Sequence, residues 1–156
     1  MTDNRAAETT LPGRRLGIDV GSVRVGVALS DPYALIARPL TTLSRDRSGA
    51  DQKIIAELVR EHEVVEVVIG LPLHLSGAHG AASDEATAYS VDVATLVEPV
   101  PVRLVDERLS TRAASALLAA RGLDSRAQRD VVDQTAAAII LQSWLDQLAH
   151  RRQGSR

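Results

Sequence analysis

Apolar residues alternate with small or polar ones over residues 15–31, which is the two-residue period of a β-strand. The pair Gly21-Ser22 interrupts this alternation and predicts a tight turn, so the segment is expected to form a hairpin of two antiparallel strands. Residues 38–43 predict a third, shorter strand that is entered through Pro39. The beginning of the chain therefore predicts an antiparallel sheet.

The middle of the chain predicts helices that alternate with buried strands. Apolar positions recur at helical spacing over residues 50–62, and a nearly continuous β-branched run over residues 64–71 is typical of a strand buried on both faces. Residues 83–97 predict a second helix with Ser83 as its N-cap, and residues 100–105 predict another buried strand. This alternation predicts parallel strands joined by crossover helices.

Two further helices are predicted at the end of the chain. Ser110 or Thr111 would cap a short one. A polar loop separates it from a final helix that runs from about Asp130 to Ala149, with Trp144 in its apolar stripe. The whole pattern predicts an α/β fold in which helices flank a mixed, five-stranded sheet.

The same pattern sets the expected domain limits. We expect one domain over residues 14–149, preceded by a flexible tail of residues 1–13 and followed by a basic tail of residues 150–156. A chain of 156 residues suits one domain with one hydrophobic core. This length argues against an actin-type ATPase or sugar kinase, because that architecture needs two such domains.

Composition limits the chemistry further. The chain has no cysteine, which excludes disulfides, a thiol nucleophile and cysteine-ligated metal sites. No apolar run reaches the roughly 18 residues of a transmembrane helix, and the first residues lack the apolar core of a signal peptide, so we expect a cytoplasmic protein without a membrane partner. The formal net charge of −2 argues against a nucleic-acid partner, although residues 103–129 hold six arginines against three acids.

Several carboxylates interrupt otherwise apolar patterns. Asp19 lies inside the first predicted strand, and Asp133 lies in the first turn of the final helix. Glu107 follows Asp106 at the carboxyl end of the last strand, where open α/β sheets bind ligands. Each acid also has an ordinary structural explanation: Asp19 could bind turn amides, Glu107 could pair with a neighbouring arginine, and Asp133 could favour the helix dipole.

Taken together, these acids indicate a metal site. No histidine or cysteine lies near them in the sequence, so the candidate ligands are hard carboxylate oxygens of the kind that Mg²⁺ or Mn²⁺ prefers. Two such ions about 4 Å apart can activate a water molecule and stabilise the leaving oxygen of a phosphodiester. The pattern is therefore typical of an enzyme that hydrolyses phosphodiester bonds.

Four segments in the same order resemble the motifs of the YqgF (RuvX) family, whose members are described as pre-16S rRNA nucleases and as Holliday junction resolvase-like proteins. They are residues 16–22 with 24–28 (LGIDVGS, RVGVA), residues 68–73 (VIGLPL), residues 106–111 (DERLST) and residues 132–134 with 136–141 (VDQ, AAAIIL). The resemblance covers nearly the whole chain between the predicted tails. It implies a ribonuclease H-like fold and a metal-dependent nuclease.

The resemblance also implies roles for single residues. The family's catalytic acids, which would bind Mg²⁺ or Mn²⁺ as two ions, correspond to Asp19, Glu107 and Asp133, with Asp106 as a candidate additional ligand. Candidate phosphate contacts, chosen because they lie beside these acids and can donate hydrogen bonds, are Arg24, Arg108, Ser110 and Thr111. Asp130 shares a helix face with Asp133 but lies outside the matched motif, so we interpret it as a helix cap.

The resemblance favours hydrolysis in the 5′-end processing of pre-16S rRNA during ribosome biogenesis. One alternative is a Holliday junction resolvase acting on four-way DNA in recombination and repair, which needs two active sites and hence a two-fold dimer. Another is a non-catalytic nucleic-acid-binding module of the same fold. The sequence leaves open whether the partner is precursor rRNA or branched DNA, and whether the protein is a monomer or a homodimer.

Overall fold

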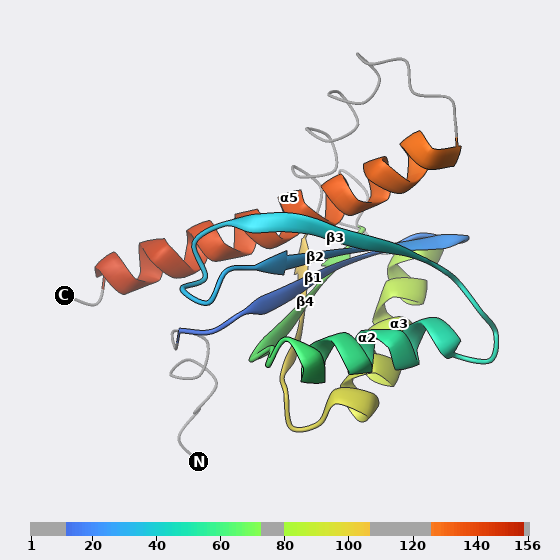
Figure 1. Cartoon of the computed structure of the whole chain (residues 1–156), viewed down its shortest axis with the longest axis horizontal. Helices are drawn as coiled ribbons and strands as arrows, with labels where there is room; N and C mark the ends of the chain where they lie inside the picture. The colour runs from blue at the N-terminus through green and yellow to red at the C-terminus, as the bar shows by residue number, and fades with distance from the viewer. Residues whose placement is uncertain (1–11, 73–79, 107–125, 155–156) are drawn as a thin grey trace.

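A mixed sheet of five strands in the order β3-β2-β1-β4-β5 lies at the centre of the molecule (Figure 1). The computed structural model describes residues 12–72, 80–106 and 126–154. Within these residues the elements, in chain order, are β1 (Arg15–Val20), β2 (Arg24–Ser30), β3 (Ala37–Ser44), α2 (Ala50–Glu61), β4 (Glu66–Leu71), α3 (Ala81–Val97), β5 (Val102–Asp106) and α5 (Arg126–Gly154). The predicted mixed, five-stranded sheet with flanking helices is confirmed.

The sheet combines an antiparallel and a parallel half. β1, β2 and β3 form the predicted antiparallel meander, whereas β4 and β5 run parallel to β1. The hairpin between β1 and β2 is closed by the Gly21 amide, which donates to the Arg24 carbonyl oxygen at 2.9 Å. Because α2 and α3 return the chain across one face, the carboxyl ends of β1, β4 and β5 meet at the same edge of the sheet.

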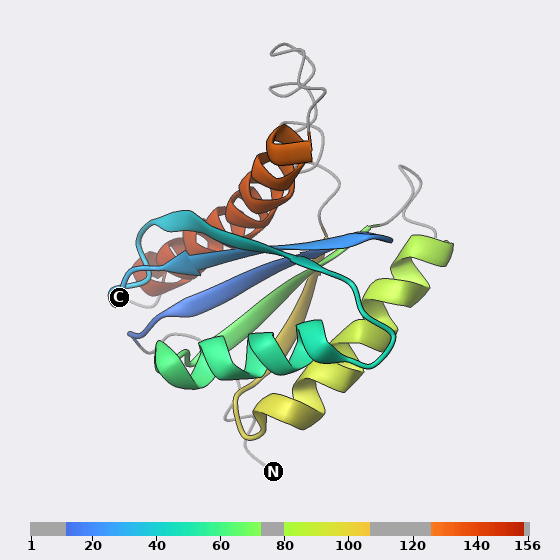
Figure 2. The ribbon, with the colours of Figure 1, turned by 45° about the vertical axis from the view of Figure 1, so that its right-hand side comes forward.

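The two faces of the sheet are covered by different helices, α2 and α3 on one face and α5 on the other (Figure 2). Alternate residues of the strands divide between the two layers of core. Leu16 and Ile18 of β1 pack with Tyr89 of α3, whereas Val68 of β4 packs with Trp144 of α5. The sheet therefore has apolar side chains on both faces, as the β-branched runs of the sequence predict.

The final helix is longer than its apolar stripe predicts. The sequence places this helix at about residues 130–149, whereas α5 runs from Arg126 to Gly154. The added residues are mostly polar and lack apolar periodicity, yet alanine, arginine and glutamine propagate a helix well. Asp133 consequently lies about two turns inside α5 instead of in its first turn. Residues 150–154, predicted as part of a basic tail, continue the helix.

Helix α3 begins earlier than predicted. Its first residue is Ala81, its N-cap position is Gly80, and no side chain caps it by a hydrogen bond. Ser83 was wrongly predicted as the cap, because its side chain is fully buried inside the first turn of the helix. Among the helices of the described ranges, none is long and apolar enough to cross a membrane.

The limits of two strands also shift. β4 and β5 begin at Glu66 and Val102, two residues later than their apolar runs predict, because the preceding residues close the ends of α2 and α3. The Val64 amide, for example, donates to the Val59 carbonyl oxygen at 2.9 Å. The short helix predicted near residue 110 and most of the predicted N-terminal tail lie outside the described residues.

Candidate active site

A row of three residues crosses β1, β2 and β3 on the face that α5 covers. Asp19 of β1 lies directly opposite Gly26 of β2, and Gly26 lies opposite Thr42 of β3. Residues directly opposite each other on neighbouring strands direct their side chains to the same face of the sheet. The Asp19 carboxylate therefore lies on the α5 face, close to the carboxyl end of β1.

Helix α5 crosses this row in close contact with Gly26. A Cβ atom at Gly26 would overlap the backbone carbonyl of Asp133, so only glycine lets the helix approach this near. About one turn earlier in α5, the Thr42 hydroxyl donates to the Asp130 carbonyl oxygen at 2.6 Å. The fold thus brings Asp19 and Asp133, two of the predicted catalytic acids, to neighbouring positions on one face of the sheet.

Arg24 lies two residues before Gly26 in β2 and pairs with the acids of α5. Its Nε donates to Asp133 Oδ2 at 2.7 Å and lies 3.7 Å from Asp130 Oδ1. The sequence predicts Arg24 as a phosphate contact; in the free protein its guanidinium instead compensates these two carboxylates. The interpretation of Asp130 as a helix cap was wrong. Asp130 lies inside α5 and forms an ion pair with Arg24, as Asp133 also does.

Of the remaining predicted acids, the structure describes Asp106, the last residue of β5. Val102 packs in the core beneath α3, whereas Val105 packs in the core beneath α5. Asp106 is related to Val102 by the two-residue period of the strand, so alternation directs it to the α3 side, away from Asp19. The predicted residues that lie outside the described ranges are Glu107, Arg108, Ser110 and Thr111.

The donor set on the α5 face fits a divalent cation. Asp19 and Asp133 offer carboxylate oxygens, the ligand type that Mg²⁺ and Mn²⁺ prefer. The Asp133 carboxylate already pairs with the Arg24 guanidinium, so a metal ion bound there would have to share or displace this contact. Within the described parts of the chain, no group of three or more histidine, aspartate or glutamate side chains is arranged to hold a metal ion.

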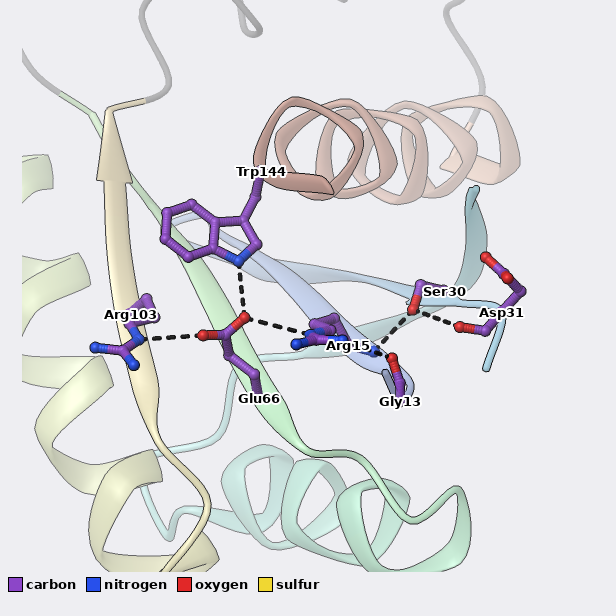
Figure 3. Close-up of polar contacts among 7 residues, drawn as sticks. All are labelled: Gly13, Arg15, Ser30, Asp31, Glu66, Arg103 and Trp144. Carbon is purple, nitrogen blue, oxygen red and sulfur yellow. Dashed lines mark hydrogen bonds and ion pairs between the residues drawn. The ribbon is translucent and has the colours of Figure 1, made fainter. Parts of the chain in front are cut away.

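A buried ion-pair network that the sequence did not predict lies at the opposite end of β1 (Figure 3). Glu66, at the start of β4, accepts hydrogen bonds from Arg15 Nε at 3.4 Å, Arg103 Nε at 3.1 Å and Trp144 Nε1 at 2.7 Å. The side chains of Arg15 and Glu66 are 0% and 2% exposed. Burial lowers the pKa of Arg15, although the charge of Glu66 opposes this effect.

This network fixes the helix that carries Asp133. It joins β1, β4 and β5 to Trp144 of α5 (Figure 3). The helix is therefore bonded to the sheet at Trp144 and rests on Gly26 at Asp133. One signal in the sequence could have revealed it. Glu66 is a charged residue inside a run of valines and isoleucines, and a carboxylate buried there needs a compensating partner.

The order of the strands and the helices on both faces of the sheet define the class of the protein: it has a ribonuclease H-like fold. RuvC of Thermus thermophilus, solved with a Holliday junction substrate, aligns with a TM-score of 0.56 over 90% of this chain and 96% of its own, at 15% identity. The fowlpox virus resolvase, solved with Holliday junction DNA, aligns with a TM-score of 0.53 over 86% and 98%, at 8% identity. At these identities the likeness shows a shared fold.

Sequence similarity then identifies the family. Residues 13–147 match the family described as "RuvX: Holliday junction resolvase". A relative from Mycobacterium leprae is 54% identical over 135 residues, covering 86% of this chain and 73% of the relative. One from Mycolicibacterium smegmatis is 44% identical over 162 residues, covering 99% and 95%. Both are named "Putative pre-16S rRNA nuclease". The chain belongs to the RuvX family.

Proposed function

We propose that this protein is a divalent-metal-dependent endonuclease that hydrolyses phosphodiester bonds during 5′-end processing of pre-16S rRNA. The observation that carries the proposal is the convergence of Asp19 and Asp133 across Gly26. Acids held by a strand and a helix at the carboxyl end of the central strand form a rigid, oxygen-rich site. The names of the mycobacterial relatives support an RNA substrate, and we place the activity in the cytoplasm, where ribosomes are assembled.

Each residue of the site has a defined role in this proposal. Asp19 and Asp133 would hold Mg²⁺ or Mn²⁺, and Glu107 would complete the ligand set. Bound metal ions would supply an activated water and stabilise the leaving oxygen. Arg24 begins the strand beside these acids, and its planar guanidinium suits a two-point contact with a phosphate group of the substrate.

The substitution Asp19→Asn tests the catalytic role. Asparagine keeps the shape of the side chain but removes the charge that a metal ligand needs. We expect Mn²⁺-dependent cleavage of an RNA with the pre-16S leader to fall by more than about 100-fold, because losing even a group that orients a metal ligand costs about 10–100-fold. RNA affinity, measured by fluorescence anisotropy without metal, should stay at the wild-type value.

Asp84→Asn is the matched control for this test. Asp84 is an exposed acid in the first turn of α3, on the other face of the sheet, and its substitution removes the same charge. This variant should cleave at the wild-type rate. If Asp19→Asn also cleaved at the wild-type rate, the assignment of Asp19 as a catalytic acid would be wrong.

The family description favours a second candidate function, resolution of Holliday junctions. A resolvase cuts two strands and therefore needs two active sites related by a two-fold axis. Cleavage of a precursor rRNA leader and of a synthetic four-way DNA junction should be compared side by side, with Asp19→Asn as the control and sedimentation reporting the oligomeric state. Cleavage of the RNA by a monomer supports the rRNA role, whereas paired cuts in the junction by a dimer support the resolvase.

A further inference from the structure

Arg24 pairs with two acids of α5 while part of its own side chain stays exposed to solvent. Its Nε donates to Asp133 Oδ2 at 2.7 Å, and Asp130 Oδ1 lies 3.7 Å away. The Arg24 side chain is 26% exposed. A guanidinium carries five N–H donors, and the contacts with described acids are made through Nε. The outer side of the guanidinium can therefore accept a second anion.

The positive charge of Arg24 stabilises the neighbouring carboxylates of α5. Asp130 and Asp133 are three residues apart on one face of α5, so their carboxylates repel each other, and Asp19 lies on the same side of the sheet. Arg24 offsets this repulsion. A divalent cation that binds the Asp133 carboxylate must compete with Arg24 for the same oxygen and also repels its like charge.

A phosphate group changes this competition. When the guanidinium pairs with a phosphate of the substrate, its positive charge is compensated from outside and its hold on Asp133 weakens. The Asp133 carboxylate then becomes available to the cation. In the reverse direction, Arg24 would be released for a phosphate when a cation is held by Asp133.

We propose that Arg24 couples cation binding to polynucleotide binding: it holds Asp133 in the free protein and gives up this carboxylate when it pairs with a substrate phosphate. The inference rests on the proposed function, because it takes Asp133 as a metal ligand and a nucleic acid as the substrate. By thermodynamic linkage, each ligand must raise the affinity of the other by the same factor. The metal site consequently reaches its full affinity only when a strand is bound.

Isothermal titration with Mn²⁺, with and without a phosphorothioate RNA oligonucleotide that resists hydrolysis, measures this coupling. In the wild-type protein, RNA should raise the Mn²⁺ affinity roughly five-fold, at the lower end of the usual range for coupled sites. Arg24→Gln removes the competitor, so the free variant should bind Mn²⁺ more tightly than the wild type and gain little from RNA. Arg24→Lys keeps the charge and should retain part of the coupling.

Arg60→Gln is the matched control. Arg60 is an exposed arginine in the last turn of α2, on the other face of the sheet, so the substitution removes the same charge far from Asp133. It should leave both affinities and their coupling unchanged, and thermal melting verifies that every variant is folded. If Mn²⁺ and RNA bound independently to the wild type, or if Arg24→Gln and Arg60→Gln had equal effects, the coupling through Arg24 would be wrong. The proposed function would be unaffected by either result. A wild-type protein that binds no Mn²⁺ would instead overturn the proposed function.

Discussion

Gly26 is the residue at which the site is most sensitive to added volume. Alanine at this position would force a methyl group into the Asp133 carbonyl, so α5 would have to move away from β2. We expect Gly26→Ala to lower the free energy of unfolding by about 1–3 kcal/mol, the usual cost of overpacking. Cleavage should also fall, because Asp133 moves away from Asp19. Urea denaturation and a cleavage assay measure the two effects.

Gly154→Ala is the control for this substitution. Gly154 ends the same helix, and a Cβ there would meet no atom within 4 Å. We expect a change within about 0.5 kcal/mol, as for other surface substitutions. Equal stability and activity of the two alanine variants would show that α5 does not depend on the close approach at Gly26.

At the residue scale, the sequence predicts the acids but not their partners. Asp19 could be found because it interrupts a local strand pattern, and local patterns are visible in one sequence. The partner of Arg24 could not, because Asp133 lies 109 residues further along the chain and nothing in the local pattern encodes that contact. Gly26 offered a weaker signal, since a glycine inside a strand often marks a close approach of another backbone.

At the scale of the elements, hydrophobic periodicity locates the buried part of each helix and misses the rest. The limits of α2 are predicted almost to the residue from its periodicity, because most of the helix packs on the sheet. By contrast, α5 extends at both ends beyond the residues that face the core, so its apolar stripe is shorter than the helix (Figure 1). The polar ends of α5 are set by helix propensity, which is a weak signal in a short window.

The network around Glu66 provides a test at this scale. Glu66→Gln removes the charge that compensates Arg15 and Arg103 but keeps an oxygen that can accept from Trp144. We expect the free energy of unfolding to fall by about 3–5 kcal/mol, as when one partner of a buried ion pair is removed. Urea denaturation followed by fluorescence measures this, and Trp144 is the single tryptophan of the chain.

Glu57→Gln is the control for the network. Glu57 is exposed on α2, so the substitution removes the same charge from a solvated position. Its stability should match that of the wild type within about 0.5 kcal/mol. A similar, small effect at Glu66 would mean that the two arginines find other compensation and that the network does not anchor α5.

At the scale of the whole molecule, the formal net charge of −2 is a poor guide to the partner. Many of the described charges are already compensated inside the fold, as Arg15 and Arg103 are by Glu66, and Arg24 is by Asp133. The affinity for a polynucleotide depends on the local charge around the site, not on the net charge of the chain. Two bound divalent ions would add four positive charges there, where the substrate phosphates should lie.

Polynucleotide affinity should therefore rise when Mn²⁺ is added at constant ionic strength, and it should fall as NaCl is raised. For a single strand, each phosphate that the protein neutralises contributes a slope of about −0.7 to the plot of log affinity against log salt concentration. Fluorescence anisotropy with a labelled phosphorothioate RNA measures both dependences. The variant Asp19→Asn, which lacks one proposed ligand, should keep the salt dependence and lose most of the response to Mn²⁺. If the wild-type affinity did not respond to Mn²⁺, the metal would not recruit the substrate. If Asp19→Asn responded as the wild type does, the ion would act at a place other than the acids of β1 and α5.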